Sequence, residues 1–170
     1  HPTAVPGMTM GPWGGHFDRT ETWFEPGKAW LNYVARCQFL LQQGRFVADL
    51  LYFAGEDSPA RTPQRADLNP APPPGHDFDT VDAGTIRKRI KIADGRIVLP
   101  DGMSYRVLVL PDKRTMTLPL LHKIHDLVKQ GMPLVVRGAK PDSTPGLVGL
   151  PASDTELRRL GGELWGDLNG

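Results

Sequence analysis

The chain has 170 residues, enough for one domain with a substantial core and too few for two ordinary ones. Its 19 glycines and 17 prolines exceed the average usage of about 7% and 5%, which argues against a helical bundle or coiled coil. Because 39% of the residues are hydrophobic and the formal net charge is only +1, the composition also argues against disorder and against a nucleic-acid partner.

The sequence gives little information about the cellular compartment of the protein. No apolar run reaches the roughly 18 to 20 residues of a membrane span, so no membrane partner is expected. No secretory leader is visible, and the localisation stays unknown. The single cysteine, Cys37, excludes an internal disulfide framework and a cysteine-based zinc site. The chain starts at His1 without a methionine, which indicates processing, trimming or a piece of something longer.

The first elements alternate between irregular and apolar segments. Residues 1–27 read as irregular because glycine and proline recur throughout. Residues 28–43 predict a helix that Gly44 caps, with one apolar stripe made of Trp30, Val34, Cys37 and Leu41. The cysteine is expected to be a small buried hydrophobe of that stripe. Residues 46–53 form an apolar run typical of a parallel strand covered on both faces.

The middle of the chain predicts a long loop followed by short strands. The proline-rich loop 58–76 is of a length that is usually functional or disordered. Residues 78–81 read as a strand, and Asp82 then caps a short helix. Residues 90–100 predict a hairpin around the turn dipeptide Asp94-Gly95. Residues 105–110 are the clearest buried strand.

The last third continues the alternation. Thr117 is expected to cap a helix that ends at Gly131, and a parallel-type strand follows at 134–136. A second glycine- and proline-rich loop covers 138–152. The sequence Ser153-Asp154-Thr155-Glu156 is a capping box that predicts the start of the last helix.

This order of elements predicts an α/β fold. Residues 28 to about 165 alternate helix and strand with one inserted hairpin, which favours a doubly wound, mainly parallel sheet of flavodoxin-like size. Ligands of such sheets collect at the carboxyl ends of the strands. Here those ends carry acidic and basic residues: Glu56, Asp57, Asp82, Asp112, Lys113, Arg114 and Arg137.

The sequence lacks the motifs of several common kinds of binding site and catalytic site. Neither a dinucleotide-binding glycine motif nor a Walker-type loop follows a strand, and no nucleophile stands at a strand-to-helix turn. His122 and His125 have a spacing that can hold a metal, but both are expected on the polar side of their helix as surface residues. Glu56 and Asp57 end a strand, where one could act as an acid or base or could instead anchor a loop or cap a helix.

The richest stretch is residues 11–24, which mix aromatic side chains with charged and hydroxyl groups on a glycine-rich backbone. Aromatic faces pack on the apolar side of sugar rings, and charged groups bond to the hydroxyls. A packed structural loop would have the same composition. The stretch therefore predicts carbohydrate contact, with structural packing as the alternative.

At this stretch the sequence resembles family-106 glycoside hydrolases, the α-L-rhamnosidases. The resemblance covers nearly the whole chain and is most specific as far as residue 111. The matching segments are Pro6–Gly14, His16–Thr20, Thr22–Trp23, Tyr33–Gln38, Leu40–Gly44, Val47–Asp49, Tyr52–Phe53, Gly55–Asp57, Leu99–Tyr105 and Leu108–Pro111.

The resemblance implies a large enzyme whose catalytic barrel carries two carboxylates acting by inversion, with calcium at the active site of the full-length protein. Residues 1–27 would be the loop that closes the barrel. Residues 28–170 would be a class I amidotransferase-like α/β domain, with a leading helix at 28–43. No cofactor is expected in this chain itself, and a periplasmic or secreted parent would carry its leader upstream.

The resemblance also implies a carbohydrate partner, a rhamnoside-like glycan. Substrate contacts are expected at Trp13, His16, Asp18, Arg19 and Trp23. Catalytic candidates, chosen by residue type, are Glu21, Glu56 and Asp57.

Three interpretations stay open from the sequence. The chain is part of a glycosidase with a catalytically silent α/β domain; or it is a free-standing binding or oligomerisation module; or it has weak glycosidase activity of its own. Apolar residues in the segment 1–43 predict a homo-oligomer if no barrel covers them.

Overall fold

The computed structural model describes residues 17, 22–58 and 61–166. The chain divides into two compact units, His1–Arg45 and Phe46–Gly170. The sequence placed the boundary after residue 27, whereas the structural division places the leading helix in the first unit. In the described ranges, no helix combines the length and the apolar character that crossing a membrane requires.

The described part of the first unit is a turn followed by one helix. Helix α1 spans Lys28–Leu41 and confirms the predicted helix, although Gln42 rather than Gly44 is its C-cap. The predicted burial of its apolar stripe is wrong. No residue of α1 is buried: Trp30 and Leu41 are 54% and 82% exposed, and Cys37 is only half-buried. Within its own unit the Phe17 ring stacks on Trp30, with ring centroids 6.2 Å apart, but this contact leaves the stripe unburied.

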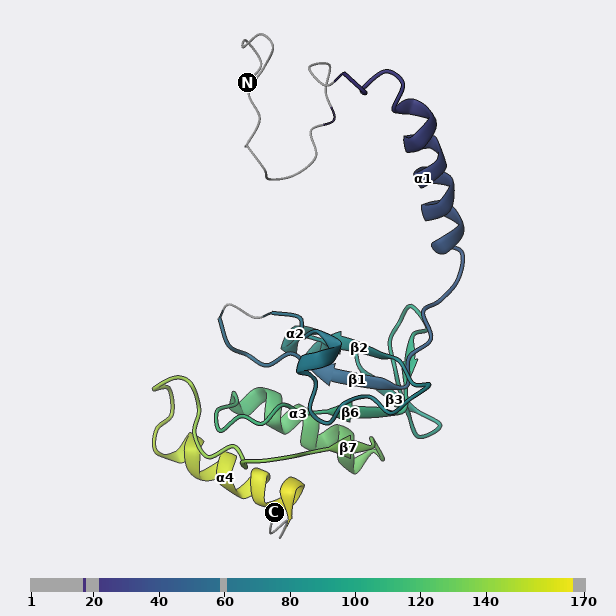
Figure 1. The fold of residues 1–170 in the computed structure, drawn as a ribbon. Helices are drawn as coiled ribbons and strands as arrows, with labels where there is room; N and C mark the ends of the chain where they lie inside the picture. Colours follow the sequence, from purple (N-terminus) through teal and green to yellow (C-terminus); the bar gives the residue numbers. More distant parts are fainter. Residues whose placement is uncertain (1–16, 18–21, 59–60, 167–170) are drawn as a thin grey trace, which may run out of the picture. The chain divides into compact units, whose positions relative to one another are not determined.

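The second unit is built on a four-stranded parallel sheet (Figure 1). In spatial order its strands are β2 (Phe78–Val81), β1 (Leu50–Phe53), β6 (Val107–Val109) and β7 (Leu134–Val135). Strand β1 is shorter than the predicted run 46–53. Its pairing begins at Leu50, which lies opposite Phe78 on one side and Val107 on the other. Phe46 is consequently left exposed.

A second, antiparallel sheet contains β3 (Lys91–Ala93), β4 (Arg96–Val98) and β5 (Ser104–Tyr105). The predicted hairpin is confirmed. Asp94 and Gly95 both take positive φ, +51° and +69°, as the tight turn between β3 and β4 requires. The predicted strand 105–110 is divided between two sheets, because Tyr105 pairs with β4 while Val107–Val109 pair with β1 and β7.

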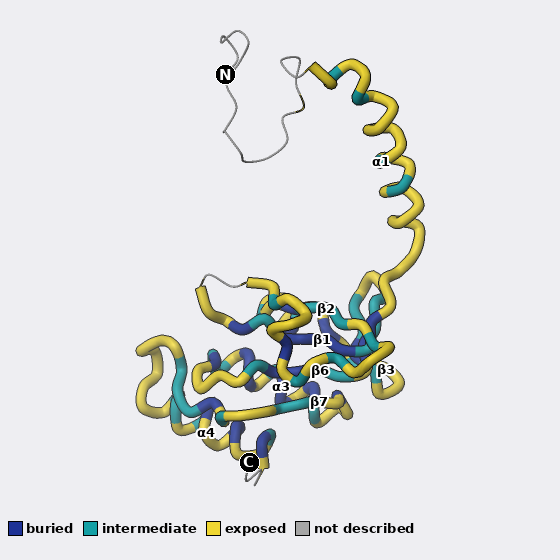
Figure 2. Tube along the Cα trace, viewed as in Figure 1, coloured by how far each residue is buried: buried dark blue, intermediate teal, exposed yellow. Residues whose placement is uncertain are grey.

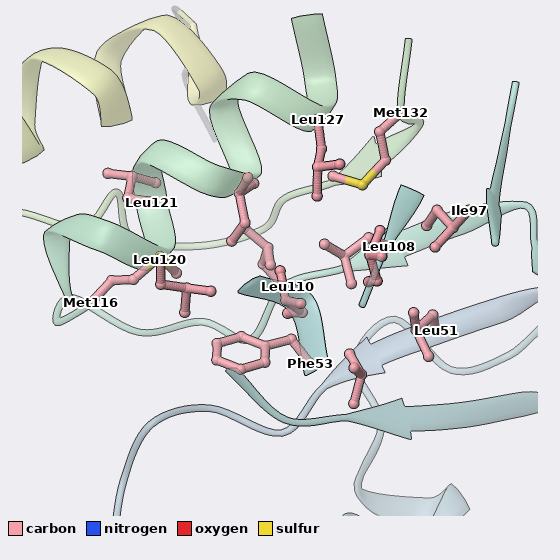
Figure 3. Close-up of a cluster of buried hydrophobic side chains, with 14 of the residues drawn as sticks. Leu51, Phe53, Ile97, Leu108, Leu110, Met116, Leu120, Leu121, Leu127 and Met132 are labelled. Carbon is pink, nitrogen blue, oxygen red and sulfur yellow. The ribbon is translucent and has the colours of Figure 1, made fainter. Parts of the chain in front are cut away.

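One face of the parallel sheet is covered by helices α2 (Ala83–Lys88), α3 (Leu118–Lys129) and α4 (Ala152–Trp165). Leu51, Phe53 and Leu108 face α3 across this core, as Figure 3 shows. The buried residues follow the strands and the inner side of the helices in Figure 2. The alternation along β1 is that of a strand: Leu51 and Phe53 belong to this cluster, and Leu50 and Tyr52 to another.

The opposite face of the sheet is covered differently. There Leu50, Tyr52 and Val109 pack against Leu68, which belongs to the proline-rich loop and follows a short 3-10 helix, η1 (Arg65–Asp67). A doubly wound sheet was predicted, with helices on both faces. In the described residues, the three α-helices of this unit all pack into the cluster on the first face.

Helix α4 starts differently from the prediction. Its N-cap is Pro151 and no side chain caps it, so the predicted capping box at Ser153 is wrong. The helix begins at Ala152, one residue before Ser153, so Ser153 already lies inside it, and the Glu156 carboxylate is bonded to Arg159 instead. Asp154 turns back to the preceding loop, where its carboxylate accepts hydrogen bonds from the Thr144 backbone N–H (2.8 Å) and hydroxyl (2.9 Å). The loop 138–152 is therefore tied to the helix that follows it.

Candidate functional site

The carboxyl ends of β1 and β6 are the natural place for a site in this sheet. The chain leaves β1 for β2 on one side and leaves β6 for β7 on the other. Such a reversal of strand order opens a crevice between the two connections, where ligands of α/β sheets bind. The segments that follow these strands contain Glu56 and Asp57 after β1, and Asp112 and Lys113 after β6.

Glu56 caps a helix from a distance. Its two carboxylate oxygens accept hydrogen bonds from the Thr117 backbone N–H and hydroxyl, each at 2.7 Å. Thr117 is the N-cap of α3, as predicted, although its own side chain makes no capping bond to the helix. A carboxylate there also interacts favourably with the positive end of the helix dipole. Glu56 thus occupies the helix-capping position that the sequence left open as an alternative.

Asp57 points to a different partner. Its carboxylate lies 2.8 Å from Lys113 Nζ, with both side chains about half exposed. Glu56 and Asp57 line a hollow of only about 30 Å³ with Lys113 and Pro145. Because the two carboxylates have separate partners and little space between them, they do not converge on one substrate atom.

Asp112 holds the loop after β7. Its Oδ1 accepts a hydrogen bond of 2.8 Å from the Ala139 backbone N–H. Gly138 has φ +69°, and any Cβ at this position would overlap the Asp112 carboxylate. A glycine is therefore required for the loop to approach Asp112 this closely.

A larger cavity, of about 190 Å³, lies between the carboxyl ends of β1 and β6 and the proline-rich loop. Two contacts fix the loop above it: the Tyr52 hydroxyl donates to the Pro70 carbonyl (2.6 Å), and Arg137 donates to the Asn69 side-chain oxygen (2.9 Å). The cavity is lined by Tyr52, Phe53, Ala54, Arg61, Pro63, Asp67, Leu68, Asn69, Leu110, Pro111 and Asp112.

Asp82, which the sequence grouped with this crevice, is the N-cap of α2. Its carboxylate accepts hydrogen bonds from the Thr85 backbone N–H (3.0 Å) and hydroxyl (2.7 Å). These bonds, the one from the hydroxyl first, hold the pKa of Asp82 below its ordinary value. Asp82 lines neither of the two cavities above.

Most residues expected to contact substrate fall outside the described ranges: Trp13, His16, Asp18, Arg19 and the catalytic candidate Glu21. Trp23 is described, and it is 38% exposed. Its ring meets Phe17 edge-on, with centroids 5.3 Å apart, and its carbonyl accepts a 2.7 Å hydrogen bond from the Gly27 N–H. Trp23 thus belongs to a small aromatic cluster that leads into α1.

One of the two predicted surface histidines is buried. His125 is only 7% exposed because α4 packs over this edge of α3, and its Nε2 lies 2.7 Å from Glu163. This hydrogen bond is the main cause that lowers the pKa of Glu163. His122 stays partly exposed, 3.8 Å from Glu156. Across the described residues, no group of three or more His, Cys, Asp or Glu side chains could hold a metal ion.

A further cluster, which the sequence did not predict, lies at the amino ends of the strands, opposite the crevice. Asp49, just before β1, lies 2.6 Å from His76 Nδ1 and 2.8 Å from Arg106 Nε. The hydrogen bond with His76 is the main cause that lowers the pKa of Asp49. The partners come from three separate segments, so no local pattern could have revealed them. This cluster fastens the entry to β1, the connection before β2 and the start of β6.

Known proteins resemble this chain along nearly its whole length. The family model for glycoside hydrolase family 106, described as alpha-L-rhamnosidase, matches residues 1–170. A Formosa agariphila protein with the provisional name beta-glucuronidase is 38% identical over 162 residues, which are 95% of this chain and 13% of that protein. A solved rhamnosidase structure from Novosphingobium sp. PP1Y matches with a TM-score of 0.67 and 31% identity, over 94% of this chain and 15% of that one.

Proposed function

The chain belongs to glycoside hydrolase family 106, and we propose that it serves as the substrate-contact loop and the non-catalytic α/β domain of an α-L-rhamnosidase-like enzyme. The observation that carries the proposal is the family match over the entire chain. The chain spans 13% and 15% of the length of the two relatives, so the remaining parts of such an enzyme would supply the catalytic centre.

The arrangement of carboxylates supports a non-catalytic α/β domain. An inverting glycosidase needs two carboxyl groups about 6.5 to 9.5 Å apart with a water molecule between them. In the described crevice, the Glu56 carboxylate is bonded to Thr117 and that of Asp57 to Lys113. Their roles in holding α3 and the β6 connection favour structural functions over acid–base catalysis.

The segment 11–24 is then the part of the chain proposed to touch the glycan. Trp13 and Trp23 would pack on the apolar face of a sugar ring. His16, Asp18 and Arg19 would bond to its hydroxyl groups, with the charged side chains giving the stronger hydrogen bonds. Glu21 stays a catalytic candidate by residue type alone.

The finer fold proposal is a flavodoxin-like, amidotransferase-like domain. Taking the parallel strands in chain order, their spatial order is 2-1-3-4, which matches the first four strands of the flavodoxin-like order 2-1-3-4-5. The proline-rich loop would replace the first helix of that fold. Helices α2 and α3 follow the second and third parallel strands as that fold requires.

Calcium, which the family resemblance implies for the full-length enzyme, would not be held by the described part of this chain. Its ligands are oxygen atoms, six to eight of them, usually with several carboxylates. The described residues offer no cluster of three such side chains. We therefore assign no step of the reaction to calcium at these residues.

The substrate is proposed to be an α-L-rhamnoside, because the family description and the solved relative both bear that name. The test is hydrolysis of aryl α-L-rhamnoside and aryl β-D-glucuronide by the gene-encoded enzyme that contains this chain. We expect release of the aryl group from the rhamnoside. Turnover of the glucuronide alone would reassign the substrate to the class in the name of the Formosa agariphila relative.

A second function, a self-associating module, is favoured by one observation. Helix α1 exposes several large apolar side chains, including Trp30, Tyr33, Phe39, Leu40 and Leu41. Exposed apolar patches of this kind mark interfaces. Light scattering of the purified 170-residue chain tests this alternative: a concentration-independent monomer excludes it.

Turnover by the same preparation, lost in Glu56→Gln, would instead support an autonomous glycosidase.

A further inference from the structure

We propose that the cavity beneath the proline-rich loop is a binding site for a single neutral sugar ring, held by the α/β unit on its own. The cavity lies at the carboxyl ends of β1 and β6, the point where the strand order reverses. A loop lies over this face of the sheet where a helix would fill the space, and among the described residues of that loop Leu68 alone enters the apolar cluster.

The polar groups that line the cavity are only partly used by the fold. Asp67 accepts from the Gln64 backbone N–H with Oδ2 at 3.3 Å, and Asp112 accepts from Ala139 with Oδ1. The second oxygen of each carboxylate has no donor among the described residues. Asn69 receives Arg137 on its side-chain oxygen, which leaves its amide N–H groups to donate. The cavity therefore presents both acceptors and donors.

The charges select the class of ligand. Arg61 lies in the lining and Arg137 beside it at Asn69, which balances the two carboxylates Asp67 and Asp112. An anion would meet both carboxylates, and a cation would meet the guanidinium groups. A neutral polyhydroxylated molecule suits such a mixture best, because each hydroxyl can donate to a carboxylate and accept from a guanidinium or amide.

Size and apolar surface narrow the ligand further. A volume of about 190 Å³ exceeds by far the roughly 10–15 Å³ that one water molecule needs. It is smaller than the roughly 300–1,000 Å³ of sites for drug-sized molecules. Tyr52, Leu68, Leu110 and Pro111 supply an apolar wall for the C–H face of a ring. One monosaccharide, rather than an oligosaccharide, fits these limits.

The test is a titration of the full 170-residue chain, followed by the backbone amide signals of its nuclear magnetic resonance spectrum. The probes are L-rhamnose, D-glucose and sodium D-glucuronate, each up to high millimolar concentration. We expect one of the neutral sugars to shift the amide signals of Ala54, Leu68 and Asn69, which line the cavity. We expect the charged glucuronate to shift them less.

Two variants and one control sharpen the test. Arg61→Gln and Asp67→Asn each remove one charge from the lining and should weaken binding about tenfold or more, as expected for the loss of a charge-assisted hydrogen bond. Arg89→Gln is the matched control, because Arg89 is similarly exposed, pairs with Asp101 and lies outside the cavity. All three variants should have urea midpoints close to that of the unchanged chain.

The proposal is overturned if no sugar shifts the cavity amides, if shifts are confined to signals outside the cavity, or if Arg89→Gln weakens binding as much as Arg61→Gln. A stronger response to glucuronate would also overturn it, because the site would then select an anion. The titration measures binding and does not depend on catalysis. If the gene-encoded enzyme hydrolyses the rhamnoside but no sugar shifts the amide signals of the cavity, this inference is disproved and the proposed function remains.

Discussion

The two units differ in how much apolar surface they bury and in whether they contain the proposed substrate contacts. In the second unit, strands and helices enclose a core in which Leu108, Leu120 and Ile124 are 0% exposed. In the first unit, α1 has no buried residue. Yet residues 11–24, which contain the proposed substrate contacts, belong to the first unit. The part of the chain with a complete core and the part proposed to meet the substrate are therefore different.

This difference has a physical basis. Aromatic and charged groups that contact a substrate stay accessible, so their apolar area does not add to the burial that stabilises a closed core. The second unit has the opposite property. Its strand-end carboxylates are engaged with Thr117, Lys113 and Ala139, where they stabilise helix starts and loops.

The two units should respond very differently when one leucine is truncated in each. Leu120→Ala in the second unit should lower the free energy of unfolding by about 2–5 kcal/mol, because it opens a cavity in a closed core. Leu41→Ala in α1, where the side chain is 82% exposed, should change it by about 0.5 kcal/mol or less. Urea unfolding of both variants, followed by circular dichroism, measures the difference. Equal losses would mean that α1 shares the core.

A smaller effect is expected from the carboxylates of the crevice. Glu56→Ala removes both bonds to Thr117 and should cost about 0.5–2 kcal/mol, as the loss of a helix cap does. Asp57→Ala removes only a surface pair with Lys113 and should cost no more than about 1 kcal/mol. The urea midpoints of the two variants test this order. The capping role of Glu56 is contradicted if Asp57→Ala is the more destabilising change.

The smallest effect concerns acid. The pKa of Asp82 is lowered from its ordinary value of 3.8, mainly by the Thr85 hydroxyl and then by its backbone N–H. The charged form therefore stabilises the folded unit above about pH 4, and this contribution is lost as the pH falls through the lowered pKa. Asp82→Asn should lower the free energy of unfolding at neutral pH. The difference between this variant and the unchanged chain should shrink as the solution is acidified. A gap that stays constant from pH 7 to pH 3 would rule out this role.

The sequence predicted the parts of this molecule that depend on local patterns. The hairpin at Asp94-Gly95, the N-caps Asp82 and Thr117, and the buried strands were all readable, because turn chemistry and apolar runs are local. The partner of Glu56 was not, since Thr117 lies far along the chain. His125 was placed on a polar edge because its own helix cannot reveal that α4 covers it.

The candidate site likewise has features that the sequence predicted and features that it did not. The strand-end position of Glu56 and Asp57 followed from the apolar run that precedes them. The larger cavity did not, because Arg61, Asp67 and Asn69 reach it only after the proline-rich loop folds back over Tyr52. Its only local signal was the length of the loop. Burial of the α1 stripe was mispredicted because an apolar pattern shows which side of a helix prefers partners, not whether enough of them are present to bury it; here Phe17 stacks on Trp30 and the helix still has no buried residue.

The proposed division of roles between residues 11–24 and the α/β unit can be measured by comparing kcat/KM for an aryl α-L-rhamnoside between two variants of the gene-encoded enzyme. Arg19→Ala removes a proposed substrate contact, and Glu56→Gln changes a carboxylate assigned to structure. At a temperature where both variants stay folded, we predict a loss of about 100-fold for Arg19→Ala, the size expected for a charged hydrogen bond to substrate, and little change for Glu56→Gln. A comparable loss in Glu56→Gln with normal activity in Arg19→Ala would show that the α/β unit, and not the segment 11–24, serves the reaction.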